Sequence, residues 1–318
     1  MRAALNKGAE IIIWRFTDGK AGHDAQSQGL INALSNYLDC RIYEIPPCSL
    51  RHCLSNLIHC RFPAGDLMPD PVFLIGAGHS THAGMLCARH ARGGKNIVLM
   101  RPSLPIRWFD LCLIPDHDPP SKHKNVLRTR GPLNSLQASQ AADPGHGLIL
   151  LGGTSHHFLW DESEILQQVV TLSASGGRWT LADSRRTPES TSKALNNLVS
   201  EKIAYIPWTS TGPGWLAEKF QKCGTVWVTP DSMSMIHEAL TAGAAVGLFR
   251  LAPRGENRLS RAIRRLCSEH LVTAYDDWLQ GQTLGTAASR PLNEADRCAR
   301  MIIDKFRLGA VAEPFLDC

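Results

Sequence analysis

Small and polar residues follow an apolar run in two parts of the chain, and both sets could bind an anion. The first is TDGKAGH at 17–23, after the run at 11–15, and the second is DSMSM at 231–235, after the run at 225–229. Where a strand turns through small residues into a helix, the first backbone N–H groups are free and carry partial positive charge. Phosphate binds at such turns. One turn in each half predicts a phosphate-bearing ligand held in a cleft between two similar domains.

The turn in the second half opens a helix with a polar stripe. Ser232 is a suitable N-cap residue, so we expect the N–H groups of Met233 and Ser234 to point outward. Glu238 lies about one turn beyond Ser234 on the same side of the helix. A carboxylate there could accept hydrogen bonds from the hydroxyls of a ribose beside a diphosphate. The plainer alternative is that Glu238 is a solvated helix residue.

In the second half, two more expected strands end in residues that could bind phosphate. Gly152 and Gly153 would let backbone approach a phosphate closely, and Thr154 adds a hydroxyl donor, although a tight turn also needs glycine. Arg185 and Arg186 suit a diphosphate, because guanidinium binds phosphate as a fork and ligands of α/β sheets lie at the carboxyl ends of strands. A solvated turn is the alternative. The complete expected phosphate site is Gly152, Gly153, Thr154, Ser184, Arg185, Arg186, Ser232, Met233, Ser234 and Glu238.

The composition indicates a globular protein of two domains. The 318 residues are 43% hydrophobic and 20% charged. The net charge of +5 suits an anionic small molecule or a membrane surface, and the absence of aromatic–basic interleaving argues against nucleic acid. No long apolar stretch or secretory signal is visible, so we expect a cytoplasmic protein. Its 10 cysteines, without a C-x-x-C pair, are expected to be reduced thiols.

Apolar runs that alternate with helical patterns predict an α/β fold with parallel sheets. The expected strands are 11–15, 41–45, 72–76, 96–100, 110–114 and 125–129 in the first half, and 148–153, 178–184, 203–207, 225–229 and 245–249 in the second. The stretch 131–147 is rich in turn-forming residues. We therefore expect an N-terminal domain at 1–135, a linker at 136–147 and a C-terminal domain at 148–318. An amphipathic helix is expected at about 293–307.

Several motifs together resemble one family. They are TDGKAGHDAQSQGL at 17–30, GAGHSTH at 76–82, VLMRPSLP at 98–105, IPDHD at 114–118, LLGGTS at 150–155, DSRRTP at 183–188 and VTPDSMSMIHEA at 228–239. Along most of its length the chain is similar to the mitochondrial-fission "elongated mitochondria" family and its bacterial relatives. The string EALTAGAAVGLF at 238–249 also resembles the nucleotide-sugar donor domain of GT-B glycosyltransferases. The resemblance implies two Rossmann-like domains facing a cleft, with the last helix returning to the first domain.

The resemblance implies an activity without settling the reaction. We expect a glycosyltransferase that uses a nucleotide-diphosphate sugar as substrate, needs no cofactor or metal, and acts on a lipid-linked or other cell-envelope acceptor. A nucleotide-sugar epimerase or hydrolase is one alternative, and a non-catalytic membrane-associated scaffold is another. The basic stretch 249–266 would contact the diphosphate or an anionic inner-membrane surface, unless it is a solvated charged face.

The first-half loop supplies candidates for catalysis. An acceptor hydroxyl needs a base, and His23, with Asp18, is the expected choice. Lys20, His79 and Arg101 are expected to bind substrate, with His79 alternatively bonding the loop at 17–23. Asp24 is expected to cap the helix that follows. His79 and His82 have the spacing of a metal pair, but no third ligand follows at a telling distance, so we expect no metal site.

Overall fold

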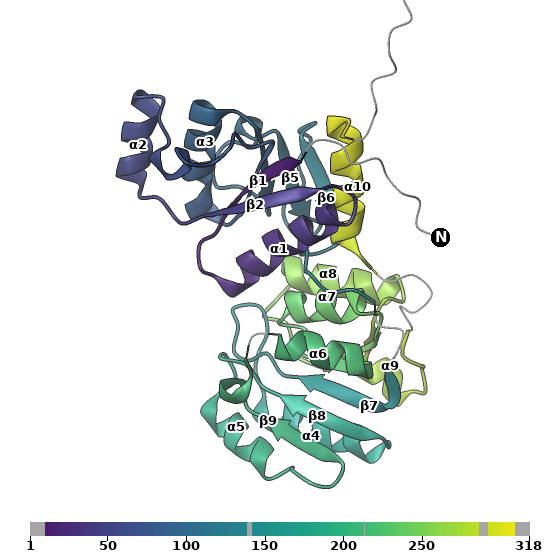
Figure 1. Ribbon diagram of the computed structural model, residues 1–318. Helices are drawn as coiled ribbons and strands as arrows, with labels where there is room; N and C mark the ends of the chain where they lie inside the picture. The colour runs from purple at the N-terminus through teal and green to yellow at the C-terminus, as the bar shows by residue number, and fades with distance from the viewer. Residues whose placement is uncertain (1–9, 139–141, 213, 286–291, 309–318) are drawn as a thin grey trace, which may run out of the picture. The chain divides into compact units, whose positions relative to one another are not determined.

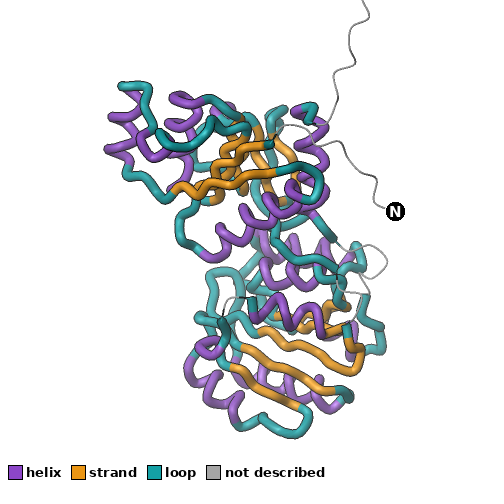
Figure 2. The backbone as a smooth tube through the Cα atoms, in the orientation of Figure 1, coloured by secondary structure: helices purple, strands orange, loops and turns teal. Residues whose placement is uncertain are grey.

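The computed structural model describes residues 10–138, 142–212, 214–285 and 292–308, and the chain divides into two compact units (Figure 1). The first unit comprises Met1–Ser135 and Glu294–Cys318, and the second is Leu136–Asn293. Each unit contains its own parallel sheet with helices on both faces (Figure 2). The predicted α/β class with two separate sheets is therefore confirmed. Within the described ranges, no helix is both long and apolar enough to cross a membrane.

The sheet of the first unit runs in the order β2-β1-β3-β4-β5-β6. Its strands are β1 (Ile11–Phe16), β2 (Cys40–Ile45), β3 (Phe73–Ala77), β4 (Lys95–Leu99), β5 (Leu111–Pro115) and β6 (Val126–Thr129). The chain moves outward from β1 to β2 and then returns to place β3 on the other side of β1. Such a reversal is a topological switch point, and ligands of doubly wound sheets bind beside it at the carboxyl ends of the strands.

Alternate residues of β1 build the two cores of this unit. Ile13 faces one core with α1 and α10, whereas Trp14 and Phe16 face the other with α3. The helices are α1 (Ala21–Ser35), α2 (Leu50–Ile58), α3 (His79–Arg92) and α10 (Glu294–Phe306), with short 3₁₀ turns η1 (Pro63–Gly65) and η2 (Ile106–Trp108). The last helix α10 packs on α1 and β6, and the Tyr37 hydroxyl donates to Asp296 over 2.6 Å. These contacts place α10 in the first unit.

The sheet of the second unit runs in the order β12-β11-β10-β7-β8-β9. Its strands are β7 (Asp143–Leu150), β8 (Arg178–Ala182), β9 (Ile203–Ile206), β10 (Cys223–Val228), β11 (Ala245–Leu248) and β12 (Thr273–Ala274). The helices are α4 (Glu162–Ala174), α5 (Glu189–Asn196), α6 (Trp215–Lys222), α7 (Met233–Thr241), α8 (Arg258–Ser268) and α9 (Tyr275–Leu279), and η3 is Trp208–Ser210. Here the strand order reverses between β7 and β10, the two central strands, so the switch point lies at their carboxyl ends.

Two boundaries differ from the sequence prediction. The expected linker 136–147 includes the start of β7, because Asp143 pairs with Cys223 and His146 pairs with Arg178, and such backbone pairing is invisible in composition. Helix α1 begins at Ala21, so Asp24 lies within its first turn and does not cap it. An acidic residue is favourable there as well, because it faces the positive end of the helix dipole.

Candidate functional site

The carboxyl ends of β7 and β10 bring the Gly152–Gly153 turn beside the start of α7. The two strands are neighbours, with Val228 opposite Leu150. The Gly152 N–H donates to Thr229 Oγ1 over 2.7 Å, and the Gly153 N–H donates to Asp231 Oδ2 over 3.1 Å. A Cβ atom on Gly152 would lie 2.2 Å from Asp231 Oδ2, so no larger residue fits there. The glycines are needed for this close approach of two loops.

Asp231 connects the loops that follow β7, β8 and β10 through its hydrogen bonds. It was not among the residues predicted from the sequence. Its side chain is 0% exposed, and its Oδ2 atom also accepts from Arg186 Nη1 over 2.6 Å. The other oxygen, Oδ1, is buried and has no hydrogen-bond partner among the described residues. Because a buried charge is costly unless it is paired, the Arg186–Asp231 pair fixes the relative position of the β8 and β10 loops.

The predicted phosphate-binding residues of β8 divide into two groups. Arg186 is engaged with Asp231 and also donates to the Thr154 carbonyl over 3.3 Å. The Ser184 hydroxyl donates to the Gly152 carbonyl and holds the turn. Arg185 is exposed and makes no hydrogen bond or ion pair with any described residue. Arg185 is therefore the guanidinium available to a ligand.

Helix α7 begins with open backbone donors. Ser232 occupies the predicted N-cap position, and its side chain makes no capping hydrogen bond. The N–H groups of Met233 and Ser234 consequently have no partner within the helix. Met233 itself is buried, and Ser234 is exposed.

The predicted polar stripe of α7 is partly internal. The Thr241 hydroxyl donates to the carbonyl of Leu292 over 2.9 Å, and His237 is buried. Glu238 is half-buried, and its carboxylate makes no hydrogen bond or ion pair with a described residue. Desolvation by burial raises the pKa of the Glu238 carboxyl to about 7. This carboxyl can take or lose a proton near neutral pH when its surroundings change.

The equivalent edge of the first unit carries an aspartate–histidine pair. Asp18 follows β1 and lies 2.9 Å from His23 Nδ1 through its Oδ2 atom. Ser80, which follows β3, donates to the same oxygen over 3.0 Å, and the Lys20 N–H donates to Oδ1 over 3.2 Å. Gly78 has a φ of +89°, and a Cβ atom there would lie 2.3 Å from His23 Nδ1. The β1 and β3 loops thus close around the pair at the switch point.

The surroundings of Asp18 favour its ionised form. Its side chain is 2% exposed. Burial alone would raise the pKa of Asp18, but hydrogen bonds from His23, Ser80 and the Lys20 backbone lower it below the usual value. An ionised Asp18 accepts from His23 Nδ1, so the lone pair of the neutral imidazole lies on Nε2. Nε2 has no hydrogen bond within the described part of the chain, so His23 can accept a proton from a ligand.

The other candidates of the first half have different positions. Ser80, and not His79, bonds the loop at 17–23, so the alternative given for His79 is wrong. The side chains of His79 and Lys20 are exposed and make no hydrogen bond with described residues. Arg101 donates to the Pro119 carbonyl over 3.0 Å, which braces a neighbouring loop. Their expected roles in substrate binding stay predictions.

His82 is a structural residue of this unit. It is buried against Phe109, with ring centroids 5.4 Å apart, and its Nδ1 atom lies 3.3 Å from Ser103 Oγ. Desolvation, with smaller contributions from His79 and His23, lowers the pKa of His82 to about 4, which keeps it neutral. Throughout the described ranges, no three His, Cys, Asp or Glu side chains are grouped to hold a metal ion.

The basic stretch forms helix α8 and the loop before it. Asn257 and Ser260 make a capping box at its start. Arg264 pairs with Glu256 over 2.9 Å and Arg265 with Glu269 over 2.7 Å, whereas Arg250 pairs with Glu164 and Asp276. These acidic partners offset part of the positive charge, and contact of this helix with a diphosphate or a membrane stays a prediction.

Comparison with known proteins is consistent with this architecture. A family model described as mitochondrial fission ELM1 matches residues 21–306, whereas no curated protein sequence matches the chain. A solved UDP-N-acetylglucosamine 2-epimerase is similar at 13% identity, with a TM-score of 0.60 over 96% of this chain and 97% of the other. A calicheamicin glycosyltransferase is similar at 11% identity, with a TM-score of 0.52 over 96% and 99% of the two chains.

At these identities the likeness establishes the GT-B-like fold and nothing about substrates. The family model, by contrast, covers most of the sequence. The chain therefore belongs to the mitochondrial fission ELM1 family.

Proposed function

We propose that this chain is a glycosyltransferase that binds a nucleotide-diphosphate sugar in its second unit and activates an acceptor hydroxyl with its first. The observation that carries the proposal is the contrast between the two switch points. The carboxyl ends of β7 and β10 leave an arginine, helix N–H groups and a carboxyl without partners among the described residues. The carboxyl ends of β1 and β3 hold His23 against Asp18 and leave its other ring nitrogen without a described partner.

The second unit would hold the donor through groups that its own fold leaves unpaired. The diphosphate would accept hydrogen bonds from the N–H groups at the start of α7 and from Arg185. Glu238 would accept hydrogen bonds from the ribose hydroxyls. As the bond between the sugar and the diphosphate breaks, negative charge grows on the leaving phosphate oxygen. Fixed dipoles and a guanidinium stabilise such charge without a metal.

The first unit would supply the base. The acceptor oxygen forms the new bond to the sugar carbon while His23 Nε2 takes its proton, and the nucleotide diphosphate leaves. Asp18 stabilises the imidazolium that results and keeps the ring in place. The chemistry fits a hydroxyl acceptor. A lipid-linked cell-envelope acceptor, reached from the cytoplasm with peripheral contact at the inner membrane, remains part of the proposal.

A panel of nucleotide-diphosphate sugars tests the proposal by thermal shift and product analysis. A ligand that binds only the folded state raises the melting temperature. At a concentration about one hundred times its dissociation constant it adds about 2.7 kcal/mol to the free energy of unfolding. A transferase releases nucleotide diphosphate only when an acceptor is present. Release without acceptor indicates a hydrolase, and an isomerised sugar indicates an epimerase. No shift across the whole panel would support the scaffold alternative.

A further inference from the structure

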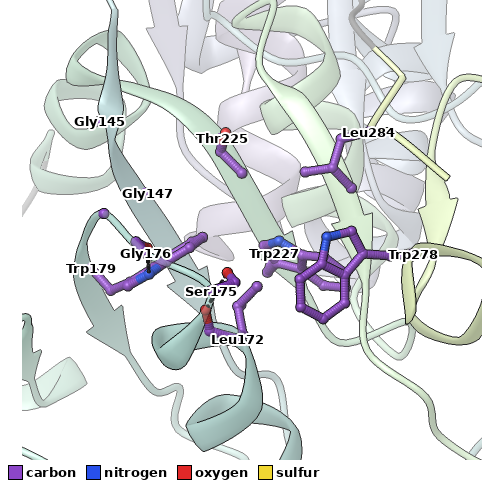
Figure 3. A pocket seen from close by; sticks show the side chains of 11 residues that line it. Gly145, Gly147, Leu172, Ser175, Gly176, Trp179, Thr225, Trp227, Trp278 and Leu284 are labelled. Carbon is purple, nitrogen blue, oxygen red and sulfur yellow. Dashed lines mark hydrogen bonds between the residues drawn. The ribbon is translucent and has the colours of Figure 1, made fainter. Parts of the chain in front are cut away.

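A cavity of about 330 Å³ lies within the second unit, near the amino ends of β7 and β8 and so at the opposite end of these strands from the Asp231 loops. Figure 3 shows the side chains that line it. Its lining comes from the first residues of β7 and β8, the end of α4, strand β10 and helix α9. The lining residues are Gly145, Gly147, Leu172, Ser175, Gly176, Gly177, Trp179, Thr225, Trp227, Trp278 and Leu284. The cavity is therefore distinct from the proposed nucleotide site.

Glycines in β7 create the floor of this cavity. Gly147 is in register with Trp179 on one side and Thr225 on the other. A Cβ atom on Gly147 would lie 2.1 Å from the Trp179 ring, so the indole occupies the space that a side chain would fill. The Trp179 N–H donates to the Gly176 carbonyl over 3.0 Å, which fixes the orientation of the ring.

The opposite wall is a pair of indoles. Figure 3 shows Trp227 and Trp278 beside each other, across the cavity from Trp179. Their ring centroids are 5.2 Å apart with an interplanar angle of 72°, an edge-to-face arrangement. Trp227 is buried and also packs on Phe249 and Tyr275, which makes this wall rigid.

The cavity offers hydrogen-bonding groups without charge. The Thr225 hydroxyl and the Trp278 N–H make no hydrogen bond with any described residue, and neither do the backbone N–H groups of Gly176 and Gly177. No Lys, Arg, Asp or Glu is among the lining residues. An ionic ligand would lack a counter-charge, and a purely apolar ligand would bury these donors without acceptors, which is unfavourable.

We propose that this cavity binds a neutral sugar ring, such as the terminal pyranose of a glycan. A pyranose combines an apolar C–H face, which stacks on the ring of the half-buried Trp278, with hydroxyl oxygens that accept from Thr225, the Trp278 N–H and the glycine N–H groups. The volume lies at the lower end of the range for small-ligand sites, about 300–1,000 Å³, which limits the occupant to a small ligand. The proposal stands independently of the proposed transferase activity, because it uses other residues at another edge.

The test is a titration of the whole protein with methyl β-glucopyranoside and with N-acetylglucosamine, up to about 100 mM. Binding is read by saturation-transfer NMR and by tryptophan emission. Ser175→Phe fills the cavity, and Ser173→Phe is the matched control. Both serines lie at the end of α4 and donate to a helix carbonyl, but Ser173 does not line the cavity. We expect saturable binding of at least one sugar in the wild type and in Ser173→Phe, and at least about tenfold weaker binding in Ser175→Phe.

Trp278→Phe guards against misfolding of the filled variant, because it keeps a ring in place and removes one donor. We expect it to weaken sugar binding about 3–10-fold with the melting temperature retained. Absence of saturation with both sugars, or equal binding in Ser175→Phe, would overturn the proposal. Titration of Ser175→Phe with the nucleotide-sugar panel separates the two sites. Nucleotide binding that persists while sugar binding is lost supports the assignment, and joint loss contradicts it.

Discussion

The carboxyl ends of β1 and β3 in the first unit correspond to those of β7 and β10 in the second, but the two edges use their polar groups in opposite ways. In the first unit, Asp18 accepts hydrogen bonds from His23, Ser80 and the Lys20 backbone, so the cluster is closed except at one imidazole nitrogen. In the second unit, Arg185 and Glu238 have no partner among the described residues.

This difference shows how one topology supports two kinds of chemistry. A cluster that satisfies itself sets the protonation state of one atom, which is what proton transfer requires. An edge that leaves donors and a carboxyl unpaired needs a ligand to supply the missing partners. The first edge is therefore suited to catalysis and the second to binding, although both arise at a strand-order reversal.

The largest expected effect is on turnover in His23→Ala. Loss of a general base costs about 10²–10⁴-fold in rate, because no other group removes the acceptor proton. Nucleotide binding should stay within about twofold, since the donor lies in the other unit. Rate and affinity are measured on one preparation, with the exposed His59→Ala as control. Full transfer activity in His23→Ala would show that the first edge is not the base.

Glu238→Gln should remove a loss of stability that the wild type shows as pH rises. The pKa of Glu238 is about 7 in the folded protein, above its ordinary value of 4.5, so the unfolded chain releases the proton first. Stability therefore falls as pH rises from about 4.5 to 7, by at most about 3 kcal/mol, and stays reduced above. Melting curves at pH 5 and pH 8 should show the variant gaining on the wild type at the higher pH. A parallel pH dependence in both proteins would refute a desolvated, unpaired carboxyl at Glu238.

Substitutions of Arg185 and Arg186 should have different effects, one on nucleotide binding and the other on stability. Arg186→Ala removes the partner of the buried Asp231 carboxylate and should lower stability by about 1–3 kcal/mol, discounted because the arginine is partly exposed. Arg185→Ala should leave the melting temperature unchanged and weaken nucleotide binding about tenfold. Thermal melts and nucleotide titrations of both variants provide the measurement. Equal melting temperatures for the pair, or an unaltered affinity in Arg185→Ala, would remove the distinction between them.

The smallest expected effect concerns Ser80→Ala. This change removes one hydrogen bond to Asp18, worth about 0.5–1.5 kcal/mol, so turnover should fall about 2–10-fold. The pKa of Asp18 should move up toward its ordinary value, which is read by NMR titration of its carboxyl carbon. His79→Ala tests the neighbouring position, where the structure records no bond to Asp18 and the Asp18 titration should not move. Unchanged turnover and an unchanged Asp18 titration in Ser80→Ala would show that this bond does not support the His23–Asp18 pair.

Local pattern predicted the elements well and their long-range pairing poorly. The apolar run at 11–15 became β1 (Ile11–Phe16), and the run at 225–229 became the end of β10, because buried parallel strands need continuous apolar residues. The start of β7 at Asp143 was missed, since it depends on its neighbours in the sheet. Helices α2 and α9 were also missed, and both are short.

The site could be predicted only in part for the same reason. Asp18 and His23 are close in sequence, so their pairing follows from a tight loop. The Ser80 bond joins residues 62 positions apart, and the Arg186–Asp231 pair spans 45 positions. No local signal marked Asp231, whose importance follows from its burial beside Gly152 and Gly153. Sequence alone also could not separate Arg185 from Arg186.

Calorimetric titration of nucleoside diphosphates into the wild type and Glu238→Gln tests the central claim most directly. The account predicts binding by the wild type that tightens as pH rises through about 7, because ionisation of Glu238 improves its acceptance of ribose hydroxyls. Glu238→Gln should bind more weakly by about 1–3 kcal/mol at pH 8 and lose this pH dependence. No binding to any nucleoside diphosphate, or the same affinity and pH dependence in both proteins, would contradict a nucleotide site at the β7/β10 edge.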